Sequence, residues 1–144
     1  MDNTALKFFD LDQYDIENRY IDQAPVKHEY RILVPVDDKA AERMYGYDIY
    51  TDGFVSSCFQ GLAFLEDTYF HVEDIFYALN DALDLFIHCY EEEIIWNENL
   101  EKAAVIVEQF MNRSEDAAKR DFARELLNLI KTAVEYETVV GFYF

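Results

Sequence analysis

The chain of 144 residues has few of the residues that build small catalytic or metal-binding motifs. It has four glycines and no GxSxG, GxGxxG or P-loop pattern, so neither a nucleophile elbow nor a phosphate-cradling loop is indicated. Its two cysteines, Cys58 and Cys89, lie 31 residues apart without a CxxC pair. We therefore expect buried free thiols, with no disulfide framework, zinc site or cofactor.

Long hydrophobic runs are also missing. No apolar stretch approaches the ~20 residues that a membrane-spanning helix needs. Near the start of the chain, Asp2, Asp10 and Asp12 surround Lys7, and this region lacks the positive charge and apolar core of a signal peptide. These features predict a cytoplasmic protein in a reducing setting, without a membrane partner.

Basic side chains are missing from one long stretch. Met44 to Glu101 contains thirteen Asp and Glu but no Lys or Arg. In the two flanking regions the numbers of acidic and basic residues are nearly balanced, and the whole chain has a net charge of -18. Such a field repels nucleic acid and anionic membranes and attracts basic proteins. The same stretch holds thirteen aromatic residues, which disordered acidic tails lack. We therefore predict a folded acidic surface over an aromatic core.

The clearest periodic pattern within this stretch runs from His71 to Glu93 and predicts one α-helix. Its apolar stripe, at steps of three and four, consists of Val72, Phe76, Leu79, Leu83, Phe86 and Tyr90. The opposite face carries Asp74, Tyr77, Asp81, Asp84, His88 and Glu91, flanked by Glu73, Glu92 and Glu93. At about 1.5 Å per residue this acidic row would span roughly 25 Å. Asp67 or Thr68 could cap the helix.

Strand patterns precede this helix. Residues 5–21 indicate a short strand and then a turn or short helix. Val26 to Val36 alternates as a half-buried strand, and Pro35 predicts that this strand ends there or lies at a sheet edge. Residues 45–50 and 54–59 flank Asp52-Gly53 and predict a hairpin. After Gly61 the pattern becomes helical.

Two further helices and a final strand follow. Asn97 or Asn99 is expected to cap a helix from Leu100, and Ser114 to cap the next one. Residues 138–144 are apolar and predict a strand added to the sheet, or a segment pinned in the core. Strands followed by helices indicate an α+β fold, with a small antiparallel sheet under about three α-helices. Residues 1–144 are expected to form a single acidic α+β domain.

An enzyme is one alternative. Asp84 and His88 are four residues apart and, with Asp81, would place two carboxylates and an imidazole on one side of the predicted helix, a geometry that can hold a divalent cation. A carboxylate-based enzyme could use the same side chains. However, a metal site needs ligands from other elements, and His28 and His71 have no partner at a recognisable spacing. We therefore assign no catalytic and no metal-binding residues.

The favoured hypothesis is a non-enzymatic, acidic protein-binding inhibitor. Carboxylates about 5–6 Å apart on a helix approximate the roughly 6–7 Å spacing of phosphates, so such a nucleic-acid mimic could occupy the basic cleft of a nucleic-acid-handling enzyme. Anti-defence inhibitors and nuclease immunity proteins would share this physics. The expected partner-binding residues are Glu73, Asp74, Tyr77, Asp81, Asp84, His88, Glu91, Glu92 and Glu93. An acidic adaptor domain is a third possibility, and an apolar rim around Trp96 would permit a homodimer.

Overall fold

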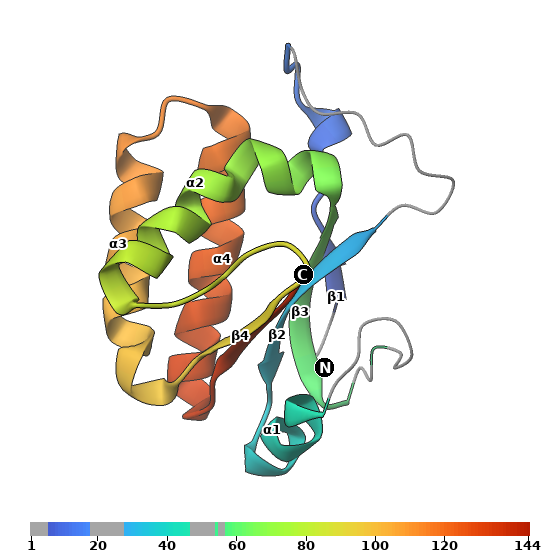
Figure 1. Ribbon diagram of the computed structural model, residues 1–144, viewed down its shortest axis with the longest axis vertical. Coiled ribbons are helices and arrows are strands. Elements are labelled where there is room, and N and C mark those ends of the chain that lie inside the picture. The colour runs from blue at the N-terminus through green and yellow to red at the C-terminus, as the bar shows by residue number, and fades with distance from the viewer. Residues whose placement is uncertain (1–5, 18–27, 47–53, 55–56) are drawn as a thin grey trace.

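The computed structural model describes residues 6–17, 28–46, 54 and 57–144. These residues form one five-stranded sheet with four α-helices (Figure 1), which confirms the α+β class. The elements in chain order are β1 (Leu6–Phe8), the 3-10 turn η1 (Leu11–Gln13), β2 (Glu29–Pro35), α1 (Asp38–Tyr45), β3 (Phe59–Leu65), α2 (Glu66–Leu83), β4 (Glu92–Ile95), η2 (Asn97–Asn99), α3 (Leu100–Arg113), α4 (Ala117–Tyr136) and β5 (Val140–Tyr143). No helix among the described residues is long and apolar enough to cross a membrane.

The sheet has the strand order β1-β3-β2-β5-β4. The C-terminal segment forms β5, as one of the two predictions for it proposed, and it lies between β2 and β4. Most neighbours are antiparallel, but β1 runs parallel to β3, so the sheet is mixed and the prediction of an antiparallel sheet was incomplete. The short strand and turn predicted near the N-terminus correspond to β1 and η1.

Strand β2 is central, and both of its faces are buried. Tyr30, Ile32 and Val34 face the main core under the large helices. Leu33 packs on the opposite face with Met44 of α1, so the predicted half-buried alternation was wrong because α1 covers the second face. Pro35 is the last residue of β2, which confirms that the strand ends there. Positions 26 and 27 of the predicted strand lie outside the described residues.

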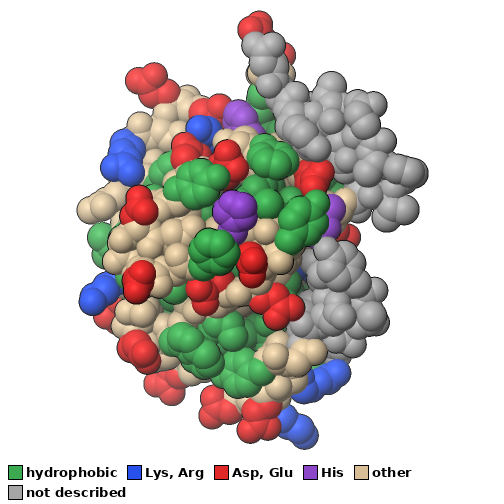
Figure 2. Space-filling model, viewed as in Figure 1, with side chains coloured by type: hydrophobic (Ala, Val, Ile, Leu, Met, Phe, Trp, Pro, Cys, Tyr) green, Lys and Arg blue, Asp and Glu red, His purple; other side chains and the backbone are tan. Residues whose placement is uncertain are grey.

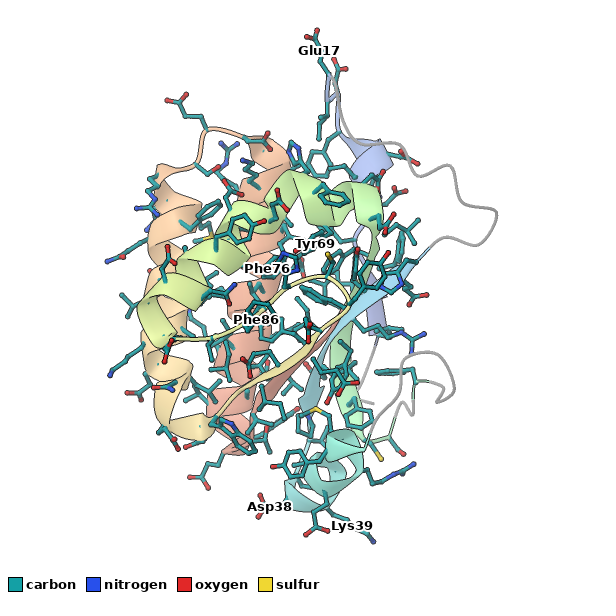
Figure 3. All side chains as sticks on the ribbon, viewed as in Figure 1. Glu17, Asp38, Lys39, Tyr69, Phe76 and Phe86 are labelled. Atoms are coloured by element: carbon teal, nitrogen blue, oxygen red, sulfur yellow. The ribbon has the colours of Figure 1, made fainter. Side chains whose placement is uncertain are left out.

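The main core is rich in aromatic rings. Phe76 of α2 is fully buried and contacts Phe64, Phe122 and Phe142 at centroid distances of 5.9–6.4 Å. Tyr69 also points into this layer (Figure 3). Within the described residues, its hydroxyl is the only buried side-chain polar atom without a hydrogen-bond partner, and burial raises its pKa. The edge-to-face contacts of Phe76 with Phe122 and Phe142 and its stacking on Phe64 orient α2 on the sheet.

The predicted change to helix after Gly61 was wrong, and the predicted hairpin is described only at its ends. Most of the hairpin lies outside the described residues; of its ends, Tyr45 closes α1 and Phe59 opens β3. Strand β3 then continues to Leu65, because a strand buried on both faces has no alternating pattern to distinguish it from a helix. A Cβ atom at Gly61 would lie 2.8 Å from Leu33 Cδ2 and 3.1 Å from the Ile32 carbonyl oxygen, so a larger residue would require these neighbours to shift.

Helix α2 follows β3 directly and ends ten residues earlier than predicted. It begins at Glu66 without a side-chain cap, so Asp67 and Thr68 lie in its first turn. It ends at Leu83, where Asp84 adopts a left-handed conformation with φ of 53°. Residues 92–95 pair with β5 instead of continuing the helix. Val72, Phe76 and Leu79 are buried as predicted, whereas Phe86 and Tyr90 are exposed and Ile87 is buried in their place.

The last two helices occur where the sequence pattern placed them. Asn99 is the N-terminal cap residue of α3, although its side chain makes no capping hydrogen bond. Ser114 ends α3 and does not start α4, so that prediction was wrong. The cap of α4 is Asp116, whose Oδ1 accepts a hydrogen bond from the Lys119 backbone N–H at 3.0 Å. Together α2, α3 and α4 form the layer on one face of the sheet.

Candidate functional site

The candidate site lies on the face formed by the end of α2, the connecting segment 84–91 and β4 (Figure 1). Figure 2 shows acidic and hydrophobic side chains interleaved on this face, while Lys and Arg side chains lie toward its outline. We define the acidic–aromatic face by its exposed or half-buried residues Tyr77, Asp81, Asp84, Phe86, His88, Tyr90 and Glu91, and by the exposed Glu92 of the edge strand β4, whose side chain points to the opposite side of that strand from Glu93.

Asn80 fixes the start of the connecting segment. Its Oδ1 accepts from the Ile87 backbone N–H at 2.7 Å, and its Nδ2 donates to the Ile87 carbonyl at 3.0 Å. Both backbone polar groups of Ile87 are thus satisfied while its side chain is buried in the core. One amide side chain therefore determines where the segment turns away from α2.

Glu93 fixes the same segment from the side of β4. Its carboxylate accepts one hydrogen bond from the Phe86 backbone N–H and one from the Ile94 backbone N–H, each at 2.9 Å. The end of the segment pairs with the C-terminus, since the Tyr90 N–H donates to the Phe144 carbonyl at 3.0 Å and the Phe144 N–H donates to the Glu91 carbonyl at 3.2 Å. These bonds pre-organise the segment, which lowers the entropy cost of binding.

Three aromatic rings are unusually exposed on this face. Phe86 is 59% exposed, Tyr90 69% and Tyr77 42%. Phe86 projects from the connecting segment (Figure 3), and the ring of His88 stacks on it with centroids 5.7 Å apart and planes 13° from parallel. Tyr90 has a φ of 64°, a conformation that a bulky residue rarely adopts. The fold therefore leaves large parts of these rings in solvent, where they stabilise the protein less than buried rings do.

Four carboxylates of the acidic–aromatic face are unpaired. Within the described part of the chain, the side chains of Asp81, Asp84, Glu91 and Glu92 have neither a hydrogen bond nor an ion pair. All four are exposed, and none lies near a Lys or Arg in sequence, because that stretch has no basic residue. Their charges are therefore available to a cationic partner.

The remaining predicted site residues have partners within the protein. Asp74 forms an ion pair with Lys119 of α4 at 2.9 Å, so its charge is largely neutralised. Glu73 accepts a hydrogen bond from the Tyr77 hydroxyl at 3.2 Å. Partial burial and this carboxylate raise the pKa of Tyr77, so the phenol keeps the proton that it donates. Glu93 supports the loop, as described above, and we assign it a structural role.

The predicted metal or catalytic arrangement is not formed. Asp81 lies on α2, Asp84 ends that helix, and His88 lies in the non-helical segment, so Asp84 and His88 do not share a helical turn. No group of three or more His, Cys, Asp or Glu among the described residues could hold a metal ion. His88 is instead close to Cys89, with Nδ1 3.5 Å from Sγ. A single contact of this kind does not define a nucleophile site.

A second candidate site is a polar pocket of about 340 Å³ between β1 and α4. Its charged groups bond mainly to one another: Lys7 pairs with Glu125 at 2.8 Å, and Asp121 accepts from the Tyr14 hydroxyl at 2.7 Å and from Arg124 at 2.8 Å. Burial and the hydrogen bond to Asp121 raise the pKa of Tyr14 to about 12. Because these groups already satisfy one another, the pocket offers little to recognise a polar ligand.

The exposed rings of Phe86 and Tyr90 were missed by sequence reasoning, which placed them in the apolar stripe of a longer helix. One signal could have identified the change. Leu85, Ile87 and Cys89 are apolar at alternate positions, a period of two that is typical of extended backbone. Trp96, around which an apolar rim was expected, is 46% exposed, and its ring lies 5.6 Å from the ring of Tyr45, which is 50% exposed.

No family model, curated protein or solved structure matches this chain.

Proposed function

We propose that this protein is a non-enzymatic inhibitor whose acidic–aromatic face occupies the basic cleft of a nucleic-acid-handling protein. The observation that carries the proposal is the group of four unpaired carboxylates among three exposed aromatic rings on a pre-organised surface. Exposed rings and complementary charge are features of protein-binding surfaces. A cleft that binds phosphates offers the matching cations.

The carboxylates do not have the regular helical spacing that the sequence predicted. The carboxylates come from a helix, a connecting segment and a strand, so they do not form one 25 Å row along a helix. What remains is charge of the right sign beside flat rings, which correspond to the phosphates and bases of a nucleic acid. We therefore propose mimicry of charge and stacking, without a regular phosphate interval.

An acidic adaptor domain is the main rival, and the enzyme alternative has no observation in its favour. We further infer a cytoplasmic location, which agrees with two cysteines that form no disulfide. Anti-defence inhibitors and nuclease immunity proteins both remain within the proposed function. The identity of the captured partner would distinguish them.

The test uses two variants that change net charge equally. The face-neutralised variant carries Asp81→Asn, Asp84→Asn, Glu91→Gln and Glu92→Gln. The control-neutralised variant changes four exposed acids outside the acidic–aromatic face: Glu42→Gln, Glu108→Gln, Glu115→Gln and Glu135→Gln. Both variants and the wild-type protein are used as baits in a native cell lysate at increasing salt.

We expect the wild-type and control-neutralised baits to capture a basic nucleic-acid-binding protein that is released by added DNA or RNA. The face-neutralised bait should capture much less of this protein. Capture of nothing by any bait would contradict the proposal, and equal capture by all three would show that this face is not the binding site. A captured partner that nucleic acid does not displace would favour the adaptor alternative.

A further inference from the structure

Two of the three exposed rings of the acidic–aromatic face lie beside carboxylates. The Tyr77 hydroxyl donates to Glu73 at 3.2 Å, and the Tyr90 hydroxyl lies 3.5 Å from Glu66 Oε1. The backbone N–H of Phe86 donates to Glu93 at 2.9 Å. Unpaired Asp81, Asp84, Glu91 and Glu92 belong to the same face. A cation that docks beside Tyr77 or Tyr90 therefore meets an aromatic ring and the carboxylate of Glu73 or Glu66 together.

We propose that the acidic–aromatic face selects arginine-rich over lysine-rich surfaces. This inference rests on the proposed function and names the chemistry of the partner more closely. A guanidinium group is planar, stacks on aromatic rings and bonds a carboxylate through two parallel N–H donors. An ammonium group is compact and strongly hydrated, so it gains charge attraction here but little from a ring.

Two further features favour this selectivity. The protein supplies no Lys or Arg from Met44 to Glu101, so no basic side chain of that stretch pairs with the four carboxylates Asp81, Asp84, Glu91 and Glu92. The stacked pair formed by Phe86 and His88 offers an extended flat surface, with centroids 5.7 Å apart. Rings that are held in place by the backbone bonds of the segment lose little freedom on binding.

The experiment compares two fluorescent peptides of equal length and charge, one made only of arginine and the other only of lysine. Fluorescence anisotropy at low salt gives the affinity of each for the wild-type protein. The ring-deficient variant carries Tyr77→Ala, Phe86→Ala and Tyr90→Asn, since asparagine tolerates the left-handed backbone at position 90. The single change Phe86→Ala serves as a second variant with less risk to the fold.

The matched control is Phe8→Ala, because Phe8 is 52% exposed but lies on β1, at the other edge of the sheet from β4. We expect the arginine peptide to bind about tenfold more tightly than the lysine peptide. This preference should fall in Phe86→Ala, disappear in the ring-deficient variant and persist in Phe8→Ala.

Equal affinity for both peptides in the wild-type protein would overturn the inference. Equal affinity for both peptides would still be consistent with the proposed function if the face-neutralised variant binds both peptides more weakly than the wild-type protein does. A preference that survives in the ring-deficient variant would also overturn it. If neither peptide binds at low salt, the acidic–aromatic face does not attract cations, and both the inference and the proposed function fail.

Discussion

The two halves of α2 differ in how the charges beside them are paired. On the side of α4, acids and bases pair: Lys119 with Asp74, and Arg124 with Asp121, both within 2.9 Å. On the acidic–aromatic face, four carboxylates have no partner within the described residues. Both surfaces lie over the same buried core. Folding therefore does not require the imbalance, and a function outside the fold is the better explanation for it.

Helix α2 contains the boundary between these two surfaces. Its first half is joined to α4 by the His71–Asp116 contact at 3.0 Å and the Asp74–Lys119 pair at 2.9 Å. Its second half carries Asp81 and ends at Asp84, where the negative end of the helix dipole disfavours acidic side chains. The arrangement costs stability at the end of the helix that faces the proposed partner.

The largest expected effect separates the core from the exposed face. Phe76→Ala should destabilise the protein by about 3–5 kcal/mol, because the ring is fully buried among other aromatic rings. Phe86→Ala should change stability by no more than about 0.5 kcal/mol, since that ring is 59% exposed. Urea unfolding of the two variants measures both values. Similar losses would mean that Phe86 belongs to the core, as the sequence pattern first indicated.

A smaller effect is expected from the loop support. Asn80→Ala removes both hydrogen bonds to Ile87 and should cost about 1–3 kcal/mol. Hydrogen exchange should accelerate at the Ile87 amide and its neighbours more than in the sheet. Asn128→Ala, at an exposed position of α4, is the matched control. If exchange in segment 84–91 stays unchanged, Asn80 does not hold the segment.

On the paired side of the molecule, the ionised carboxylate of Asp116 should make the stability of the fold depend on pH in the acid range. Burial raises the pKa of Asp116, but hydrogen bonds from Lys119 and His71 together with their charges outweigh it, so the folded-state pKa lies below 3.8. The unfolded chain therefore binds more protons as the pH falls below about 4. This part of the stability is present above that pH and is lost as the pH falls through the folded pKa.

Asp116→Asn keeps a capping side chain but removes this titration. The variant should be less stable than wild type at neutral pH, and its stability should depend less on pH below about 4. Glu115→Gln, at the adjacent exposed position, should leave the acid profile unchanged. Unfolding free energies measured across the acid range provide the comparison. Identical profiles for wild type and Asp116→Asn would show that the ionised Asp116 carboxylate does not contribute to the stability.

The smallest effect tests the unpaired side. Asp84→Asn should increase stability by about 0.3–1 kcal/mol, because it removes a negative charge at the C-terminus of α2 and asparagine accepts the left-handed conformation. The same substitution at Asp121 should decrease stability, since Asp121 bonds Tyr14 and Arg124. Thermal unfolding measures whether each of the two substitutions raises or lowers the stability. A loss of stability in Asp84→Asn would indicate that this charge supports the fold.

Sequence reasoning succeeded where one face of an element is polar. Helices α3 and α4 have such faces, and apolar residues at helical spacing in them, such as Val107, Phe122 and Leu126, are buried. It failed where tertiary contacts decide. Strand β3 is buried on both faces and shows no period, and the helical pattern around Glu92 is overridden by pairing with β5. The end of α2 carries Asp84 where glycine or asparagine is usual, so no stop signal was visible.

The candidate site could be predicted only in part. The acidity of this face could be predicted because charge follows from the amino-acid composition. Asp81, Asp84, Glu91 and Glu92 are exposed as expected. Whether a carboxylate is paired depends on elements that are distant in sequence, as Asp74 and Lys119 show. The exposed rings were hidden because aromatic residues at helical spacing usually belong to a core. Only the observed end of α2 shows that Phe86 and Tyr90 lie outside it.

The most direct test of the central claim is the association rate with the captured partner as a function of salt. The wild-type protein is compared with the face-neutralised and control-neutralised variants, which have the same net charge. The account predicts that only the face-neutralised variant associates slowly and with a flattened salt dependence. Equal slowing of both variants would show that total charge, and not the acidic–aromatic face, determines recognition.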